Sequence, residues 1–223
     1  MTLTPEVLTG QTRSHLTDVD GCLMHRDVMG DFLNLKAAAK SAGFELAVAS
    51  SFRDFERQQL IWNLKFEGQR AVLDDNGQAL DISTFTDREK ILAILRWSAL
   101  PGGSRHHWGT DLDIYAKNLL PEGVSLQLEP WEYTQGHQTP FADWLTDNLT
   151  AFGFYRPYQK DLGGVAVEPW HISHRETAQQ YLTALTPALL STVIASSAVA
   201  GREAVLAELD WIYSQYITNV SEA

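Results

Sequence analysis

The sequence predicts an α+β fold, because helical and strand-like segments are mixed along the chain without the regular alternation of parallel βαβ units. Its 223 residues, 44% of them hydrophobic, are enough to bury a substantial core. We expect one domain over residues 1–185, in which residues 1–25 form a turn-rich N-terminal arm. A C-terminal helical extension over residues 186–223 is expected to pack on this domain.

The first third of the chain predicts a helix, a strand and a second helix. Apolar residues recur at the spacing of one helical face at Val28, Phe32, Leu35 and Ala39. This helix should end near Gly43. The segment FELAVASS, residues 44–51, is short and typical of a strand. Residues 54–66 have a helical apolar face, and Asp54 is a suitable N-cap.

The middle of the chain predicts a turn, a helix and a strand. Asp-Asn-Gly lies between two short apolar pieces in residues 71–83, which is typical of a hairpin turn. Residues 87–100 form an amphipathic helical pattern that Pro-Gly-Gly stops. TDLDI, residues 110–114, then has the alternation of a strand. The connection over residues 115–140 is expected to be irregular.

The last third predicts one strand among helices. Residues 141–154 have a helical apolar face, and Gly153 is the expected stop. Residues 164–173 are strand-like, but Pro169 favours an edge position or a bulge. Two helices should close the chain, the last with apolar residues at Val205, Leu209, Ile212 and Tyr216.

Composition and charge exclude several classes of protein. The formal net charge of −11, with no offsetting basic run, disfavours nucleic acid and anionic membrane surfaces as partners. A single cysteine, Cys22, excludes an internal disulfide and a Cys-rich zinc module. The start of the chain has no basic segment followed by an apolar run. We therefore expect a cytoplasmic location, or a periplasmic one if the chain has been shortened at its N-terminus.

An uncharged stretch between Glu176 and Arg202 is too rich in polar residues for a convincing membrane span, and Pro187 interrupts it. A buried helical hairpin or a subunit interface is the expected alternative. Packing of these helices on their own domain is preferred over dimerisation, and the oligomeric state remains open.

The segment SRHHWGTDLDI, residues 104–114, gathers histidines and aspartates where a core strand would not need them. In a strand, Asp111 and Asp113 lie on one face, and the residues between and after them lie on the other. Gly109 supplies a turn that lets His106 fold back toward Asp113. One nitrogen and one oxygen ligand make half of a zinc site.

A third ligand is expected from the segment EPWH, residues 168–171. His171 supplies an imidazole, and Glu168 a carboxylate that could act on a metal-bound water. A regular strand would point these two side chains to opposite faces, but a bulge at Pro169 could turn both into one cleft. Each residue alone is more often structural or solvated, so the prediction depends on the combination.

These segments resemble the motifs S-x-H-x-x-G-x-x-x-D and E-x-W-H of the zinc D-alanyl-D-alanine carboxypeptidase family, which includes vancomycin-resistance D,D-carboxypeptidases and D,D-dipeptidases. SSFRDFERQ, residues 50–58, is similar to a third family motif, with Asp54 in place of a small hydroxyl residue. The resemblance extends from Met29 to His174.

The resemblance implies a small antiparallel sheet flanked by helices and a Zn²⁺ cofactor. The implied zinc ligands are His106, Asp113 and His171. Glu168 is then the general base, and Arg53 faces the substrate carbonyl. Ser104 and Gln58 are expected to line the substrate cleft.

The function that the resemblance implies is zinc-dependent hydrolysis of the peptide bond next to a D-amino acid in peptidoglycan-derived peptides, foremost D-Ala-D-Ala. The alternatives are an L,D-carboxypeptidase, an L-Ala-D-Glu endopeptidase, and a zinc-containing binding module without turnover. His107 could replace His106 as a ligand. Asp111 departs from the small residue of the family, and we expect it to pair with Arg105 or with a substrate ammonium group.

Overall fold

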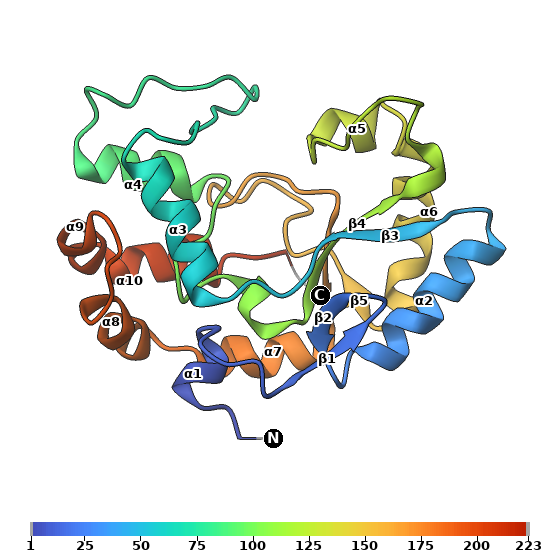
Figure 1. The fold of residues 1–223 in the computed structure, drawn as a ribbon, viewed down its shortest axis with the longest axis horizontal. Helices are drawn as coiled ribbons and strands as arrows, with labels where there is room; N and C mark the ends of the chain where they lie inside the picture. Colours follow the sequence, from blue (N-terminus) through green and yellow to red (C-terminus); the bar gives the residue numbers. More distant parts are fainter. Residues whose placement is uncertain (1, 222–223) are drawn as a thin grey trace.

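Two small antiparallel sheets lie among helices (Figure 1), so the predicted α+β fold is confirmed. The computed structural model describes residues 2–221. The strands are β1 (Leu16–Val19), β2 (Cys22–His25), β3 (Leu46–Ser50), β4 (Asp111–Ala116), β5 (Phe154–Tyr155) and β6 (His171–His174). The α-helices are α1 (Pro5–Leu8), α2 (Met29–Ser41), α3 (Phe55–Phe66), α4 (Asp87–Leu95), α5 (Pro130–Thr134), α6 (Thr139–Asn148), α7 (Arg175–Ala184), α8 (Pro187–Ala195), α9 (Arg202–Ala207) and α10 (Leu209–Ile212). Short 3₁₀ and π turns are η1 (Arg105–Trp108), η2 (Lys117–Leu119), η3 (Leu149–Phe152) and η4 (Tyr213–Ile217).

The four-stranded sheet has the order β3-β4-β6-β5, and all of its pairs are antiparallel. Side chains alternate along β4 and β6, so Leu112, Ile114 and Ile172 point to one face. These three residues are fully buried in an apolar cluster with residues of α2 and α6. The opposite face of the same strands is therefore free to carry polar groups.

A second apolar cluster lies beside the sheet and joins distant parts of the chain. Trp62 of α3 and Ile94 of α4 pack in it with residues of α1 and of the C-terminal helices. The expected extension over residues 186–223 contributes Leu190, Ile194 and Ile212 to this cluster, and its residues 222–223 lie outside the described part. Within residues 2–221, no helix has both the length and the apolar content to cross a membrane.

The helices predicted over residues 54–66, 87–100 and 141–154 are present as α3, α4 and α6, but α7 to α10 follow β6 in the described chain where two closing helices were expected. The last expected helix is divided into α9, α10 and η4. Helix α3 begins as expected, because the Asp54 side chain accepts a hydrogen bond from the backbone N–H of Arg57 at 2.9 Å. Thr86 and Glu89 form a capping box at the start of α4. The predicted turn after Asp74 is present as well, closed by an isolated bridge between Leu73 and Ala79.

Two expectations are corrected by the structure. Residues 164–170 are not a strand, and β6 begins only at His171, inside the sheet between β4 and β5 rather than at an edge. Pro169 is compatible with this interior strand because it lies before the first paired residue. The predicted N-terminal arm also contains an unexpected hairpin of β1 and β2. Its turn residues Asp20 and Gly21 both have positive φ, as an Asp-Gly hairpin requires.

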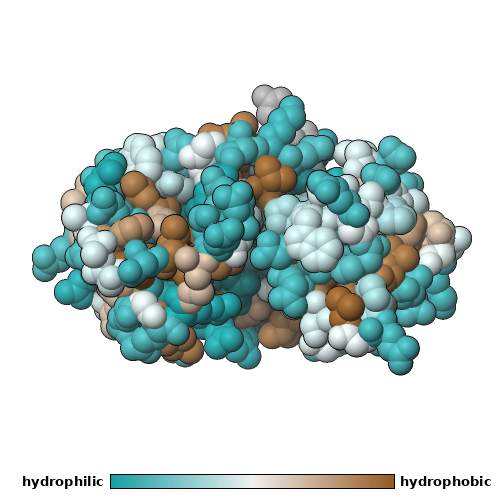
Figure 2. Space-filling view, turned by 90° about the horizontal axis from the view of Figure 1, so that it is seen from above, coloured by the Kyte–Doolittle hydropathy of each residue, from teal (hydrophilic) through white to brown (hydrophobic). Residues whose placement is uncertain are grey.

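The α3–α4 connection and α5 stand on opposite sides of β4 at the top of Figure 1. Viewed from above, this face is hollowed between the two halves of the molecule, and hydrophilic residues surround the hollow (Figure 2). A cavity of about 280 Å³ lies here, with Arg53 and Lys65 on one side and Leu128 and Glu129 on the other. Asp113 also lines it, so the cavity reaches the polar face of the sheet.

Candidate active site

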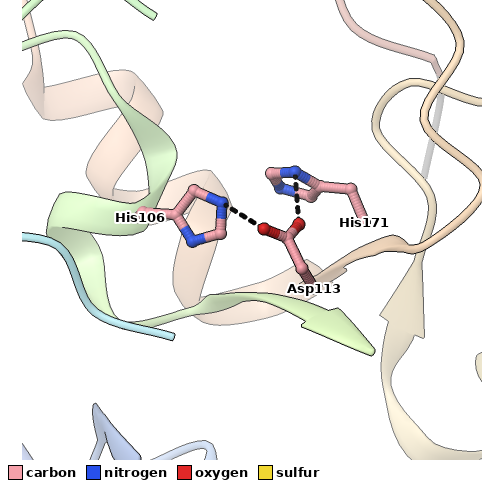
Figure 3. A group of neighbouring side chains, drawn as sticks. All are labelled: His106, Asp113 and His171. Carbon is pink, nitrogen blue, oxygen red and sulfur yellow. Dashed lines mark ion pairs between the residues drawn. The ribbon is translucent and has the colours of Figure 1, made fainter. Parts of the chain in front are cut away.

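Three side chains from separate elements converge on the polar face of the sheet (Figure 3). His106 Nε2 lies 3.4 Å from Asp113 Oδ2, and His171 Nδ1 lies 3.4 Å from Asp113 Oδ1. Each of the three residues offers one ligand atom, and these atoms lie within 4.8 Å of one another. The sequence therefore identified a set of side chains that the fold does bring together.

Two local features place these side chains. Asp113 of β4 pairs in register with His171 of β6, so both side chains emerge on the same face as cross-strand neighbours. His106 lies on η1, which ends at Gly109 with a φ of 67°. A Cβ at Gly109 would lie 2.8 Å from the backbone nitrogen of His25, so only glycine fits this turn.

Glu168 reaches the site through a tight turn rather than through a bulged strand. The backbone N–H of His171 donates to the carbonyl of Glu168 at 3.1 Å, with Pro169 at the second position of the turn. This turn places Glu168 Oε2 at 3.2 Å from His171 Nδ1. The expected convergence of the two side chains is thus achieved by proline turn geometry.

Asp111 is fully buried and paired behind His171. Its Oδ1 accepts from Arg105 Nε at 2.7 Å and lies 2.9 Å from His171 Nε2. Its Oδ2 accepts from the hydroxyls of Thr110 at 2.6 Å and Ser173 at 3.1 Å. The expected pairing of Asp111 with Arg105 is confirmed. The contact with His171 was not anticipated, because register and ring orientation cannot be deduced from residue spacing.

The carboxylates control the charge state of the site. Burial disfavours a charged His171, but Asp111, Glu168 and Asp113 outweigh burial and raise its pKa to about 10. Burial raises the pKa of Asp113 to about 6. Burial, reinforced by Arg53 and His171, lowers the pKa of His106 well below its usual value. The site therefore combines a neutral imidazole at His106 with a charged one at His171, which the surrounding carboxylates stabilise, so a cation bound at His171 would take the place of a proton.

This donor set fits a divalent metal ion. Asp113 Oδ1 is buried and has no hydrogen-bond partner, so its position suits a ligand to a cation. The other ring nitrogens are already held, since His106 Nδ1 lies 3.0 Å from the Ser51 carbonyl and His171 Nε2 contacts Asp111. Two imidazoles, each held at its other ring nitrogen, and one carboxylate are typical of a zinc site with an open position.

Arg53 stands on the other side of the opening. Its Nη1 donates to Gln58 Oε1 at 2.8 Å and its Nη2 to Ser50 Oγ at 3.1 Å. Burial lowers its pKa, against the attraction of the Asp113 and Glu168 carboxylates. Arg53 lines the cavity together with Asp113, so the guanidinium and this carboxylate border one space.

The two residues expected to line the substrate cleft are buried. Gln58 is fully buried and holds Arg53 while its Nε2 donates to the Ala99 carbonyl at 2.6 Å. Ser104 is 1% exposed and immediately precedes η1. Neither residue borders the 280 Å³ cavity. Gln58 instead contacts Arg53, which does border it.

His107 makes different contacts from those of His106. Its Nε2 accepts from the backbone N–H of Gly102 at 3.0 Å, so its Nδ1 donates to the Arg53 carbonyl at 2.6 Å. Burial lowers its pKa to about 4, which keeps the ring neutral. His107 thus fixes the backbone that carries Arg53, and His106 is the histidine that faces Asp113.

Comparison with known proteins identifies the family. The VanY family model, described as D-alanyl-D-alanine carboxypeptidase, matches residues 21–177. The chain belongs to this family of peptidases. An uncharacterized protein of Haemophilus influenzae is 50% identical over 105 residues, which are 45% of this chain and 72% of that protein. A D-alanyl-D-alanine carboxypeptidase of Enterococcus faecalis is 29% identical over 137 residues, which are 60% of this chain and 41% of that protein.

Solved structures share the fold. VanYB in complex with D-Alanine-D-Alanine superposes with a TM-score of 0.53 at 24% identity, covering 82% of this chain and 89% of that one. A mutant of the vancomycin resistance D,D-pentapeptidase VanY in complex with Zn(II) gives 0.51 at 25% identity, covering 80% and 88%. The small antiparallel sheet flanked by helices is therefore the fold of this family.

Proposed function

We propose that this peptidase is zinc-dependent and hydrolyses the bond next to a D-amino acid in peptidoglycan-derived peptides, with D-Ala-D-Ala as the terminal pair. The observation that carries the proposal is the convergence of His106, Asp113 and His171 within 4.8 Å in a chain of the VanY family. Similar structures with Zn(II) and with D-Alanine-D-Alanine support it.

In this proposal, His106, Asp113 and His171 hold the zinc ion. A zinc ion bound there lowers the pKa of a water molecule and polarises a carbonyl group. Asp111 fixes the ring of His171 from behind through the 2.9 Å contact to Nε2, so that Nδ1 faces the opening. Arg105 in turn holds Asp111, so the orientation of His171 depends on a fully buried network.

Glu168 acts as the general base. Its Oε2 lies 3.2 Å from His171 Nδ1, beside the proposed ligand atoms and at the mouth of the turn that precedes β6. From there the carboxylate accepts the proton of the attacking water and returns it to the leaving amine. A carboxylate beside the ligand cluster is needed for turnover but not for a purely structural zinc site.

Arg53 stabilises the negative charge that develops on the carbonyl oxygen. Gln58 and Ser50 hold its guanidinium in place before substrate arrives, so little reorganisation accompanies the reaction. Since Arg53 borders the same cavity as Asp113, it can face a carbonyl that enters between them.

The test combines metal analysis with product release. The purified protein should contain one zinc per chain and release D-Ala from D-Ala-D-Ala and from a pentapeptide that ends in D-Ala-D-Ala. Glu168→Gln should retain the zinc and lose about 100- to 10,000-fold in rate, because only the proton transfer is removed.

A panel of muropeptides analysed by mass spectrometry separates the alternatives. Cleavage only at a C-terminal D-Ala that follows an L-centre indicates an L,D-carboxypeptidase, and cleavage between L-Ala and D-Glu indicates an endopeptidase. A zinc-loaded protein that cleaves none of these peptides would be a binding module, and the proposed function would be rejected.

A further inference from the structure

Lys65 is a buried cation without a carboxylate partner on the α3 side of the cavity. It is 7% exposed, and its Nζ donates to Ser98 Oγ at 2.8 Å. Among residues 2–221, no carboxylate oxygen lies within 4.0 Å of this ammonium. A buried ammonium group is unfavourable unless it is paired. An anion that enters the cavity would supply the missing partner.

Two more cations border the same cavity. Arg53 and Arg70 line it with Lys65, and in the described part of the chain neither arginine forms an ion pair. The acidic lining residues are Asp113, which belongs to the proposed ligand set, and Glu129, which immediately precedes α5. Glu168 is also near enough to raise the pKa of Lys65. In a chain of net charge −11, this group of cations makes the α3 side of the cavity a local attractor for anions.

Lys65 lies further along α3 than Gln58, although Arg53 and Glu168 are both near enough to affect its pKa. It lies seven residues after Gln58, so about 10 Å further along the helix axis at 1.5 Å per residue. Gln58 holds Arg53, which faces Asp113 across the cavity. An extended peptide advances roughly 3.3 Å per residue. Lys65 is thus placed for a group some two or three residues from the bond that is cut.

The rest of the lining suits a side chain with an apolar stem. Ile61, Leu73 and Leu128 border the cavity with Trp97 and Trp170. Burial, reinforced by Arg70 and Arg53 and opposed by Glu168, lowers the pKa of Lys65 to about 8, so the ammonium is still mostly charged at pH 7. The cavity therefore offers apolar walls that lead to a positive end.

We propose that Lys65, with Arg70 beside it, binds a side-chain carboxylate of the peptide substrate, on the residue that precedes the terminal pair. This inference rests on the proposed function, since it assumes that a peptide lies in the cavity. It makes Lys65 a specificity-determining residue: peptides with a dicarboxylic amino acid at that position are preferred over their neutral counterparts.

The test uses two tripeptides that differ by one functional group, acetyl-L-Glu-D-Ala-D-Ala and acetyl-L-Gln-D-Ala-D-Ala. Calorimetric binding to the zinc-loaded Glu168→Gln protein measures recognition without turnover. We expect the glutamate peptide to bind at least 10-fold more tightly, in line with a charge-assisted hydrogen bond. In the active enzyme the same preference should appear in KM, with kcat similar for both peptides.

Substitution of Lys65 assigns the preference. In the same background, Lys65→Met should bring the two affinities within about twofold by weakening only the glutamate peptide, whereas Lys65→Arg should retain most of the preference. Lys40→Met is the matched control, because Lys40 is an exposed lysine of α2 outside the cavity. If Lys65→Met fails to fold by thermal melting, Lys65→Gln takes its place.

Three results would overturn the inference. The first is equal binding of both tripeptides, or binding of neither, to the zinc-loaded protein. The second is a preference that survives Lys65→Met. The third is that Lys65→Met weakens the binding of both peptides equally and no longer distinguishes a C-terminal carboxylate from a C-terminal amide. That result would assign Lys65 to the terminal carboxylate. Failure of the proposed function is separate, because it appears as absent D-Ala release while binding is still measured.

Discussion

The two sides of the cavity differ in whether their charged residues form ion pairs. On the sheet side, Asp111 of β4 is fully buried and paired with Arg105, and it contacts His171 of β6. On the helical side, Arg53 and Lys65 border the cavity without a carboxylate within ion-pair distance in the described part of the chain. Both sides are polar, but only on the sheet side does a buried ion pair join two side chains, Asp111 and Arg105.

This difference separates positioning from recognition. A fully paired network fixes the orientation of its members and costs stability when one is removed. Cations that the chain leaves without acidic partners remain available to a ligand. In the proposed function, the sheet side therefore sets the geometry of the zinc ligands, and the helical side supplies the charges that meet the substrate.

The largest expected effect is on the sheet side. Asp113→Ala removes the carboxylate that lies between the two imidazoles, so bound zinc should fall from one per chain to nearly none. Peptidase activity should fall below detection. Metal analysis after dialysis checks this, and a variant that keeps stoichiometric zinc would contradict the assignment of Asp113.

Stability should distinguish the two sides most clearly. Arg105→Met leaves the Asp111 carboxylate without its buried partner, and the free energy of unfolding should fall by about 3–5 kcal/mol. Lys65→Met removes a buried charge that has no counter-ion, so it should be neutral or stabilising. Urea unfolding of both variants measures this, and equal destabilisation would remove the distinction between the two sides.

Arg53→Met tests the helical side at the reacting centre. The guanidinium is pre-positioned by Gln58 and Ser50, so its loss should lower kcat by about 100- to 1000-fold. Zinc content should not change, because Arg53 is not a proposed ligand. Steady-state kinetics with matched metal analysis is the measurement, and loss of zinc from this variant would assign Arg53 a structural role.

Asp111→Asn should act on metal affinity rather than directly on chemistry. The substitution weakens the partner of His171 Nε2, and outer partners of this kind typically contribute 10- to 100-fold to metal affinity. Competition with a zinc chelator measures the change. The positioning role of Asp111 should be abandoned if affinity, pH profile and KM all match the parent protein.

The smallest effect is a pH dependence on the helical side. Burial lowers the pKa of Lys65 to about 8, so the ammonium is charged below that pH and neutral above it. The preference for the glutamate over the glutamine tripeptide should therefore be present at pH 7 and decline as pH rises through about 8. The other charged groups around the cavity are Arg53, Arg70, Asp113, Glu129 and Glu168. The ratio of the two peptides' affinities cancels the effects of these groups that are common to both peptides. A ratio that stays constant from pH 6 to 9 would contradict this role of Lys65.

The proposed ligands were predictable because their chemistry is unusual for the places where they occur. Histidine and aspartate in a segment that ends as a buried strand need a partner, and side-chain alternation already put Asp111 and Asp113 on one face. The helices also followed from apolar spacing and from caps such as Asp54. These signals depend on residues that are close together in the chain, so they can be recognised from the sequence alone.

Other features depend on contacts between distant segments. The contact of Asp111 with His171 is set by the register of β4 and β6, and the hydrogen bond from Lys65 to Ser98 joins two separate segments of the chain. Neither is visible in residue spacing. The β1–β2 hairpin is a different case, since the Asp-Gly pair at residues 20–21 was a readable turn signal in the segment expected to be an arm.

The most direct test of the account is the location of zinc in a crystal of the purified protein, measured by anomalous diffraction at the zinc absorption edge. The account predicts one strong peak in contact with His106, Asp113 and His171, with Glu168 beside it. A zinc peak that does not touch these three residues, or none after loading with the metal, would contradict it.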